Sequence, residues 1–134
     1  MTLFLDSNVL LDVFTDDEHW GDWSRAQISR YAGEPGRLLI DGVVYAEISI
    51  RYPDQVRLDE DLDGLGIRMV EPARTALFAA GKAFAAYRRR GGARTTILPD
   101  FIIGAHASDL KLPLATRDTG RYRAYFPDLV LVTP

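Results

Sequence analysis

The sequence predicts an α/β fold in which helices cover both faces of a mainly parallel sheet. Short apolar segments of strand length alternate along the chain with longer segments of helical spacing, and this alternation is typical of parallel sheets. Prolines fall at or near the segment boundaries, where they are tolerated: Pro53, Pro72, Pro99 and Pro113. The chain has 134 residues, 47% of them hydrophobic. This length and balance predict one globular domain over residues 1–134.

The strands and helices are expected in a regular order. Five apolar segments predict strands: Leu3–Leu5, Leu38–Ile40, Ile67–Val70, Leu112–Ala115 and Leu129–Val132. Six segments predict helices: Val9–Phe14, Trp20–Tyr31, Val43–Arg51, Gln55–Leu62, Ala73–Arg90 and Phe101–Leu110. Either Ser7 or Asn8 suits the N-cap of the first helix. Asp6 can assist this cap, or it can lie at the carboxyl edge of a parallel sheet, where such folds bind ligands.

Composition excludes several classes of protein. The chain has no cysteine, so disulfides, thiol nucleophiles and Cys-ligated zinc are excluded. No apolar run approaches the ~18 residues that span a bilayer, and no basic region precedes the first apolar stretch, so a cytoplasmic protein is expected. The net charge of −3 argues weakly against non-specific coating of nucleic acid. Every basic residue except Lys82 and Lys111 is arginine, and a GC-rich genome explains this bias better than phosphate binding does.

One acidic run resembles the calcium-binding loop of an EF-hand. In DEDLDGLGIRMVE, residues 59–71, several acids and Gly64 have the required spacing. However, Val70 stands where the bidentate glutamate is needed, and Glu71 comes one residue late. We therefore expect a solvated acidic turn.

Three further acids resemble Asp6 in their placement. Glu47 has apolar neighbours at helical spacing and faces inward, although an edge position with its carboxylate in water is an alternative. Asp100 opens an apolar helix, where capping is an alternative role. Asp118 follows a predicted strand, where it can simply be a turn residue. Asn8 and Thr116 can likewise be an ordinary cap and an ordinary strand end.

Taken together, these acids predict a cation site. In a parallel sheet the positions of Asp6, Glu47, Asp100 and Asp118 converge on one edge. Close carboxylates repel by roughly 4 kcal/mol per pair at an effective dielectric constant near 20, so such a cluster must be protonated or must bind a cation. Oxygen ligands without His or Cys suit Mg²⁺ or Mn²⁺.

The same residues resemble those of the PIN-domain nucleases. The motifs are LDSNVLLD with Asp6 and Asn8, the inward Glu47, PDFIIGAHA with Asp100, and LPLATRD with Asp118. The closing YFPDLVLVTP makes the chain similar to VapC-type toxins of bacterial toxin–antitoxin pairs. This resemblance covers essentially the whole chain. It implies a three-layer α/β/α sandwich whose four acids bind one or two Mg²⁺ or Mn²⁺ ions, with Asn8 and Thr116 in support.

The resemblance also implies an activity and partners. The activity is metal-dependent endoribonuclease cleavage, in which a water activated at the metal hydrolyses an RNA phosphodiester. The implied partners are RNA, a VapB-like DNA-binding antitoxin and a second copy in a homodimer. A basic antitoxin side chain could pair with the acids, and apolar antitoxin residues could bind beside Val9–Phe14 and Val43–Ile50.

Two alternative functions remain open at this stage. One is an aspartyl-phosphate phosphatase or receiver-type protein with Asp6 as nucleophile. Such proteins need an essential lysine, and neither Lys82 nor Lys111 is at a strand end. The other is a non-catalytic binding module whose acids hold a structural cation.

The segment YRRRGGARTT, residues 87–96, is the other chemically distinctive feature. Its four arginines are either a solvated helix terminus or a phosphate-binding rim beside the acids: Arg88, Arg89, Arg90 and Arg94. We expect His19 and His106 to be surface or packing residues, and Trp20 and Trp23 to pack between helices.

Overall fold

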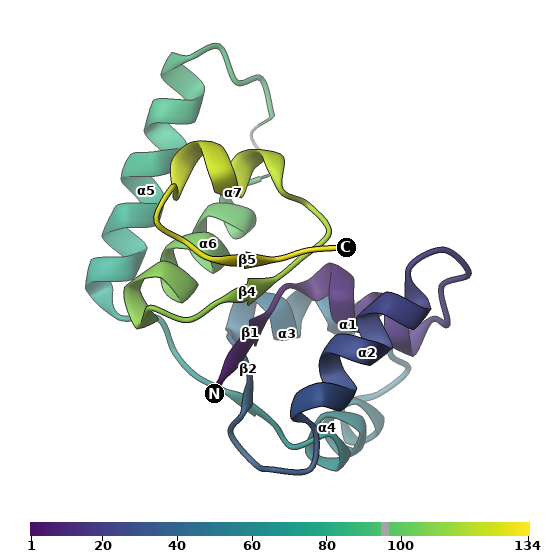
Figure 1. Ribbon diagram of the computed structural model, residues 1–134. Helices are drawn as coiled ribbons and strands as arrows, with labels where there is room; N and C mark the ends of the chain where they lie inside the picture. Colours follow the sequence, from purple (N-terminus) through teal and green to yellow (C-terminus); the bar gives the residue numbers. More distant parts are fainter. Residues whose placement is uncertain (95–96) are drawn as a thin grey trace.

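The computed structural model describes residues 1–94 and 97–134. Its centre is a five-stranded sheet in the order β3-β2-β1-β4-β5, and every strand pair is parallel. The strands are β1 (Leu3–Leu5), β2 (Leu38–Ile40), β3 (Ile67–Met69), β4 (Leu114–Ala115) and β5 (Leu131–Val132). The predicted α/β fold with a parallel sheet is thereby confirmed, and β1 is the central strand (Figure 1).

Helices connect each strand to the next. They are α1 (Ser7–Phe14), α2 (Gly21–Tyr31), α3 (Gly42–Ser49), α4 (Gln55–Gly64), α5 (Arg74–Arg89), α6 (Leu98–Leu110) and α7 (Gly120–Tyr125). Figure 1 shows two groups of helices, α5 with α6 and α1 with α2, on opposite sides of the sheet. No helix in the part of the chain that the structure describes is long and apolar enough to cross a membrane.

The strands β1, β2, β4 and β5 form where the sequence is continuously apolar, whereas the edge strand β3 contains exposed Arg68. All three residues of β1 are completely buried, as expected for a central parallel strand covered on both faces. Asp6 follows β1 directly and has extended backbone geometry, and its side chain accepts a hydrogen bond from the Ser7 backbone N–H. The N-cap of α1 is therefore Asp6, and the prediction of Ser7 or Asn8 was wrong by one or two residues.

The acidic run at residues 59–71 was predicted to be a solvated turn, but only Leu65 and Gly66 form a turn, between the predicted helix and the predicted strand. The first half of the run belongs to α4, which Asp54 caps by accepting a hydrogen bond from the Arg57 N–H. Asp59 and Asp61 accept hydrogen bonds from the Tyr45 and Tyr52 hydroxyls. These acids therefore join α4 to the α3 segment.

The six-residue helix α7 was not predicted from the sequence. It packs onto α6 at Gly104, where an added Cβ would lie 2.7 Å from the Phe126 ring. Buried Tyr122 also comes within 3.0 Å of that position. A glycine is thus required at residue 104 for close approach of the two elements, and this approach places α7 beside the end of β1.

Candidate active site

The structure places the four predicted acids around the carboxyl ends of the central strand β1 and its neighbour β4. Asp6 directly follows β1, and Asp118 lies shortly after β4. Asp100 is in the first turn of α6, and Glu47 lies on α3. This is the sheet edge where open parallel α/β proteins bind ligands.

Asp6 is the most constrained of these carboxylates. Its side chain is nearly fully buried, and Oδ2 accepts hydrogen bonds from the Thr116 hydroxyl at 2.8 Å and the Tyr122 hydroxyl at 2.9 Å. Burial raises the pKa of Asp6 to about 6, although the bonds from Thr116 and Tyr122 oppose the rise. The negative charge of Asp100 raises the pKa further. A group in this environment favours either a proton or a cation.

Asn8 and Thr116 support Asp6, as the family resemblance implies. The Asn8 amide donates to Asp6 Oδ2 at 3.4 Å and to Thr116 Oγ1 at 3.3 Å. Its carbonyl oxygen accepts the Arg117 backbone N–H. The Thr116 hydroxyl also accepts the Asp118 backbone N–H at 3.0 Å. The start of α1 and the loop after β4 are therefore joined by side-chain hydrogen bonds.

Arg121 lies between two of the acids. Its Nη2 donates to Asp100 Oδ2 at 2.5 Å and to Asp118 Oδ2 at 2.7 Å. The three side chains are between 25% and 41% exposed, so the site opens to solvent here. Burial lowers the pKa of Arg121, but the two carboxylates more than offset this effect and the pKa rises.

Glu47 faces the same site from α3. Its Oε1 is buried and has no hydrogen-bond partner among the described residues. Burial raises the pKa of Glu47, a hydrogen bond with the Ser7 side chain opposes the rise, and the negative charges of Asp6 and Asp100 add to it. An unpaired buried carboxylate oxygen is costly unless a proton or a cation satisfies it.

These observations bear on a divalent metal, which the family resemblance implies. The donors are all carboxylate oxygens, as Mg²⁺ and Mn²⁺ prefer, and Glu47 offers an unused oxygen. Within residues 1–94 and 97–134, however, no three His, Cys, Asp or Glu side chains are grouped closely enough to hold a metal ion. The residues therefore fit the metal chemically, and Arg121 fills the space between two of them.

Sequence reasoning missed Arg121 and Tyr122 because it missed α7. Tyr122 is buried and donates to Asp6, and burial together with the neighbouring acids raises its pKa far above the usual range. The signal that could have found α7 is the apolar spacing of Tyr122, Tyr125 and Phe126 after the Gly120 break.

A partly buried ion pair holds the loop after β4 against the first two helices. Arg117 donates from Nε and Nη2 to both carboxylate oxygens of buried Asp12, at 2.7 and 2.9 Å. Ser24 of α2 donates to the same carboxylate at 2.9 Å. The Arg117 guanidinium also lies over the Trp20 ring, 5.5 Å from its centroid. Trp20 therefore has a packing role, as expected.

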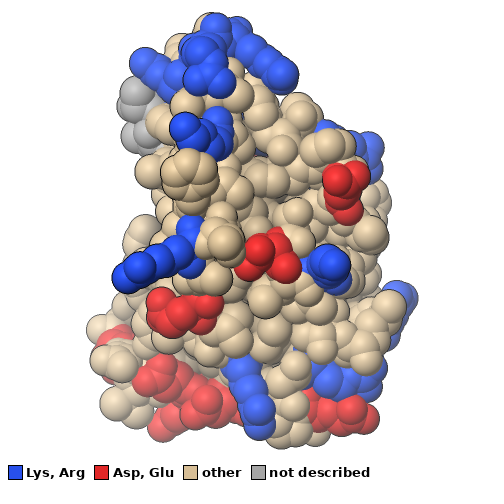
Figure 2. Space-filling model, turned by 90° about the vertical axis from the view of Figure 1, so that its left-hand side faces the viewer, with Lys and Arg blue, Asp and Glu red and all other residues tan. Residues whose placement is uncertain are grey.

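The predicted arginine cluster lies where α5 ends. Figure 2 shows Lys and Arg side chains gathered at this end of the molecule. Arg88, Arg89 and Arg90 are exposed, and the Arg90 guanidinium lies 5.3 Å from the Tyr125 ring centroid of α7. Arg94 is exposed as well, whereas Thr95 and Thr96 of the predicted segment lie outside the described residues.

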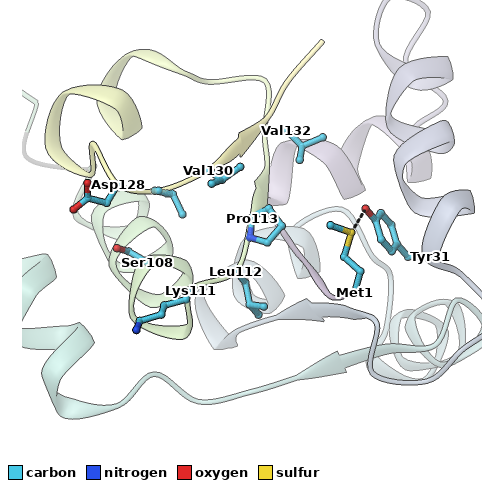
Figure 3. A pocket seen from close by; sticks show the side chains of 10 residues that line it. Met1, Tyr31, Ser108, Lys111, Leu112, Pro113, Asp128, Val130 and Val132 are labelled. Carbon is cyan, nitrogen blue, oxygen red and sulfur yellow. Dashed lines mark hydrogen bonds between the residues drawn. The ribbon is translucent and has the colours of Figure 1, made fainter.

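A cavity lined by Met1, Pro113 and Val130 is separate from these acids. It has a volume of about 700 Å³, and these three residues precede strands (Figure 3). Lys111 lines it, and Lys82 instead lies over the exposed Phe78 ring of α5. Neither lysine therefore takes the place beside Asp6 that an aspartyl-phosphate enzyme requires, which argues against that alternative.

Comparison with known families agrees with this geometry. The model of the PIN domain family matches residues 3–127. The chain therefore belongs to the PIN domain family, which confirms the resemblance of its sequence motifs. No curated protein sequence gives a significant match.

Solved structures with a similar fold come from toxin–antitoxin complexes. VapBC2 from Rickettsia felis, bound to a promoter DNA fragment, matches with a TM-score of 0.71 and 16% identity, covering 99% of this chain and 98% of that one. FitAcB from Neisseria gonorrhoeae matches with a TM-score of 0.69 and 18% identity, covering 97% and 96%. A toxin–antitoxin complex from Klebsiella pneumoniae matches with a TM-score of 0.66 and 23% identity, covering 99% and 97%. At these identities the likeness establishes the fold.

Proposed function

We propose that this protein is a Mg²⁺- or Mn²⁺-dependent endoribonuclease and the toxin of a toxin–antitoxin pair. The observation that supports it most is the placement at one edge of a parallel sheet of buried Asp6, of Glu47 with its unpaired Oε1, and of Asp100 and Asp118, which share Arg121. Membership of the PIN domain family supports the nuclease class. The similar fold of VapBC and FitAB proteins supports the toxin assignment.

The proposed chemistry is hydrolysis of an RNA phosphodiester. Asp6, Glu47, Asp100 and Asp118 would hold the cation, which would supply Lewis-acid stabilisation of charge on the phosphate oxygens. Thr116 and Tyr122 hold Asp6 in one orientation through their hydrogen bonds to Oδ2. Asn8 keeps Thr116 beside Asp6. These residues preorganise the carboxylate, which is their expected contribution to catalysis.

Cleavage of RNA in defined metal conditions tests the nuclease proposal. We expect cleavage with Mg²⁺ or Mn²⁺ and none in chelator. Asp100→Asn should lose most activity, whereas Asp109→Asn, on the exposed end of the same helix, should not. Glu47→Gln should also lose activity, with exposed Glu60→Gln of α4 as its control. Full activity of both site variants would contradict the proposal.

The surface beside α1 and α4 suits an antitoxin segment. Two hollows of about 260 Å³ each share Tyr52, and one of them also includes Phe14 at the end of α1. Ile50 and Val56 beside them are 80% and 67% exposed. Val9, Val44 and Ile48 belong instead to the buried core, so the proposed contact uses the ends of the early helices. An exposed apolar surface of this kind suits the apolar face of a partner segment.

Co-expression with the adjacent gene tests the toxin assignment. We expect a small DNA-binding protein to co-purify and to block RNA cleavage. Excess Mn²⁺ should partly relieve this inhibition. Ile50→Asp combined with Val56→Asp should weaken this complex and leave cleavage by the free protein unchanged. A neighbouring protein that neither binds nor inhibits would remove the toxin assignment and leave the nuclease proposal standing.

A further inference from the structure

Arg121 is the one basic side chain that the described structure places in contact with both Asp100 and Asp118. A single nitrogen, Nη2, donates to one oxygen of each carboxylate, so its two N–H groups are shared between two acids. Arginine usually binds a carboxylate through two parallel hydrogen bonds, and neither acid is bound in that way here. Arg121 therefore acts toward these oxygens as a point charge between two anions.

The remainder of the guanidinium is poorly satisfied in this position. Nε of Arg121 is buried and has no hydrogen-bond partner among residues 1–94 and 97–134. The side chain is 25% exposed, so it has a route toward solvent. An arginine held mainly by charge, with a buried N–H unpaired, is bound less firmly than one with full hydrogen bonding.

We propose that Arg121 is a built-in competitor of the divalent metal, which gains access to Asp100 and Asp118 only when the guanidinium leaves them. This inference rests on the proposed metal-dependent function. The positive charge at Nη2 lies against Oδ2 of both acids, so a divalent cation that takes these two oxygens meets a like charge at close range until the guanidinium moves away. When no metal is bound, the positive charge of Arg121 offsets the repulsion between Asp100 and Asp118.

Calorimetric titration of Mn²⁺ into metal-free protein tests the competition. Arg121→Met should bind Mn²⁺ about tenfold more tightly than wild type, because no side chain has to be displaced. Arg123→Met is the matched control, since it removes the same charge from the exposed side of α7. It should stay within about twofold of wild type, as expected for a screened surface charge. Affinity of Arg121→Met no greater than that of Arg123→Met would overturn the inference.

Nitrogen NMR of the arginine side chains in wild type needs no variant and reports the displacement directly. Without metal, the Arg121 guanidinium should show hindered rotation, because Nη2 is held by two carboxylates. Saturating Mg²⁺ should release it, while the Arg117 signals, held by Asp12, should stay unchanged. Arg121 signals that do not respond to Mg²⁺ would overturn the inference even if Arg121→Met binds metal tightly, since the effect would then be long-range charge alone.

The results also separate this inference from the proposed function. If wild type binds Mn²⁺ and cleaves RNA but Arg121 does not move, only the competition is wrong. If neither wild type nor Arg121→Met binds Mn²⁺, the metal-dependent function and the competition are both wrong.

Discussion

His106 Nδ1 lies 2.9 Å from Asp41 Oδ2, and both side chains are completely or almost completely buried. Asp41 also caps α3 by accepting the Val44 backbone N–H, and His106 packs edge-on against the Phe4 ring of β1. The pair thus connects the helix that contains Glu47 to the helix that contains Asp100. His106 is a packing residue, as expected, and it also fixes the spacing of two elements of the candidate site.

Breaking this pair should destabilise the protein. His106→Leu removes the partner of a buried carboxylate oxygen, so we expect the free energy of unfolding to fall by at least about 2 kcal/mol. His19→Leu, at an exposed position, should change it by less than about 0.5 kcal/mol. Urea unfolding of both variants measures the difference. Equal stability of His106→Leu and wild type would show that the pair contributes nothing net.

The raised pKa of Asp6 predicts how stability depends on pH in chelator. Because the pKa of Asp6 is about 6 in the folded protein against an ordinary value of 3.8, the folded state favours the protonated form. Below about pH 3.8 Asp6 is protonated in both the folded and the unfolded state, so it costs no stability. As the pH rises from there through about 6, the unfolded state loses its proton more readily and the folded state loses stability. The difference between the two pKa values corresponds to about 3 kcal/mol in the free energy of unfolding.

Asp6→Asn should accordingly stabilise the metal-free protein at pH 7.5 and lose this advantage near pH 4. Thermal unfolding of wild type and variant across this range measures the effect. Asp16→Asn, at an exposed position, is the control and should show no such crossover. A destabilised Asp6→Asn at pH 7.5 would show that the hydrogen bonds from Thr116 and Tyr122 outweigh burial.

Divalent metal should restore the stability that the ionised Asp6 costs at neutral pH. Only the folded state brings the acids together, so millimolar Mg²⁺ or Mn²⁺ should raise the thermal midpoint of wild type. Asp6→Asn and Asp100→Asn should respond less, and Asp109→Asn should respond as wild type does. The absence of any shift in wild type would count against the metal site.

The arginines at the end of α5 should contribute to RNA binding. Replacing Arg88, Arg89, Arg90 and Arg94 with Gln should weaken binding and flatten its dependence on salt, because phosphate contacts release counterions. The matched control removes the same charge from four exposed arginines elsewhere: Arg30, Arg57, Arg68 and Arg74. Fluorescence anisotropy over a range of salt concentrations measures both slopes. Equal slopes for the two variants would favour a solvated helix terminus.

Much of the fold could be predicted because buried parallel strands are continuously apolar. Leu3–Leu5 and Leu38–Ile40 were predicted with the observed bounds. The short helix α7 contains no such continuous apolar run, and its only signal, the spacing of Tyr122, Tyr125 and Phe126 after Gly120, is weak over six residues. The rule that ligands bind at the carboxyl ends of parallel strands predicted one sheet edge for Asp6 and Asp118, and these residues do follow the neighbouring strands β1 and β4.

The contacts within the site were harder to predict than the positions of the acids. Arg121 meets Asp100 only because α7 packs on α6 at Gly104, which no local pattern reveals. Asp41 and His106 are 65 residues apart and belong to segments that look like an ordinary cap and an ordinary apolar helix. Asp41 and His106 pair because both are buried, and their burial depends on the packing of the whole fold.

The central position of β1 has a consequence for synthesis on the ribosome. Asp6 is made 110 residues before its partner Thr116, and β1 gains its neighbour β4 only when that later segment is made. At about 5–20 residues per second, Asp6 waits roughly ten seconds for the groups that orient it. The proposed nuclease site is therefore incomplete in a nascent chain until β4 and the residues that follow it have emerged.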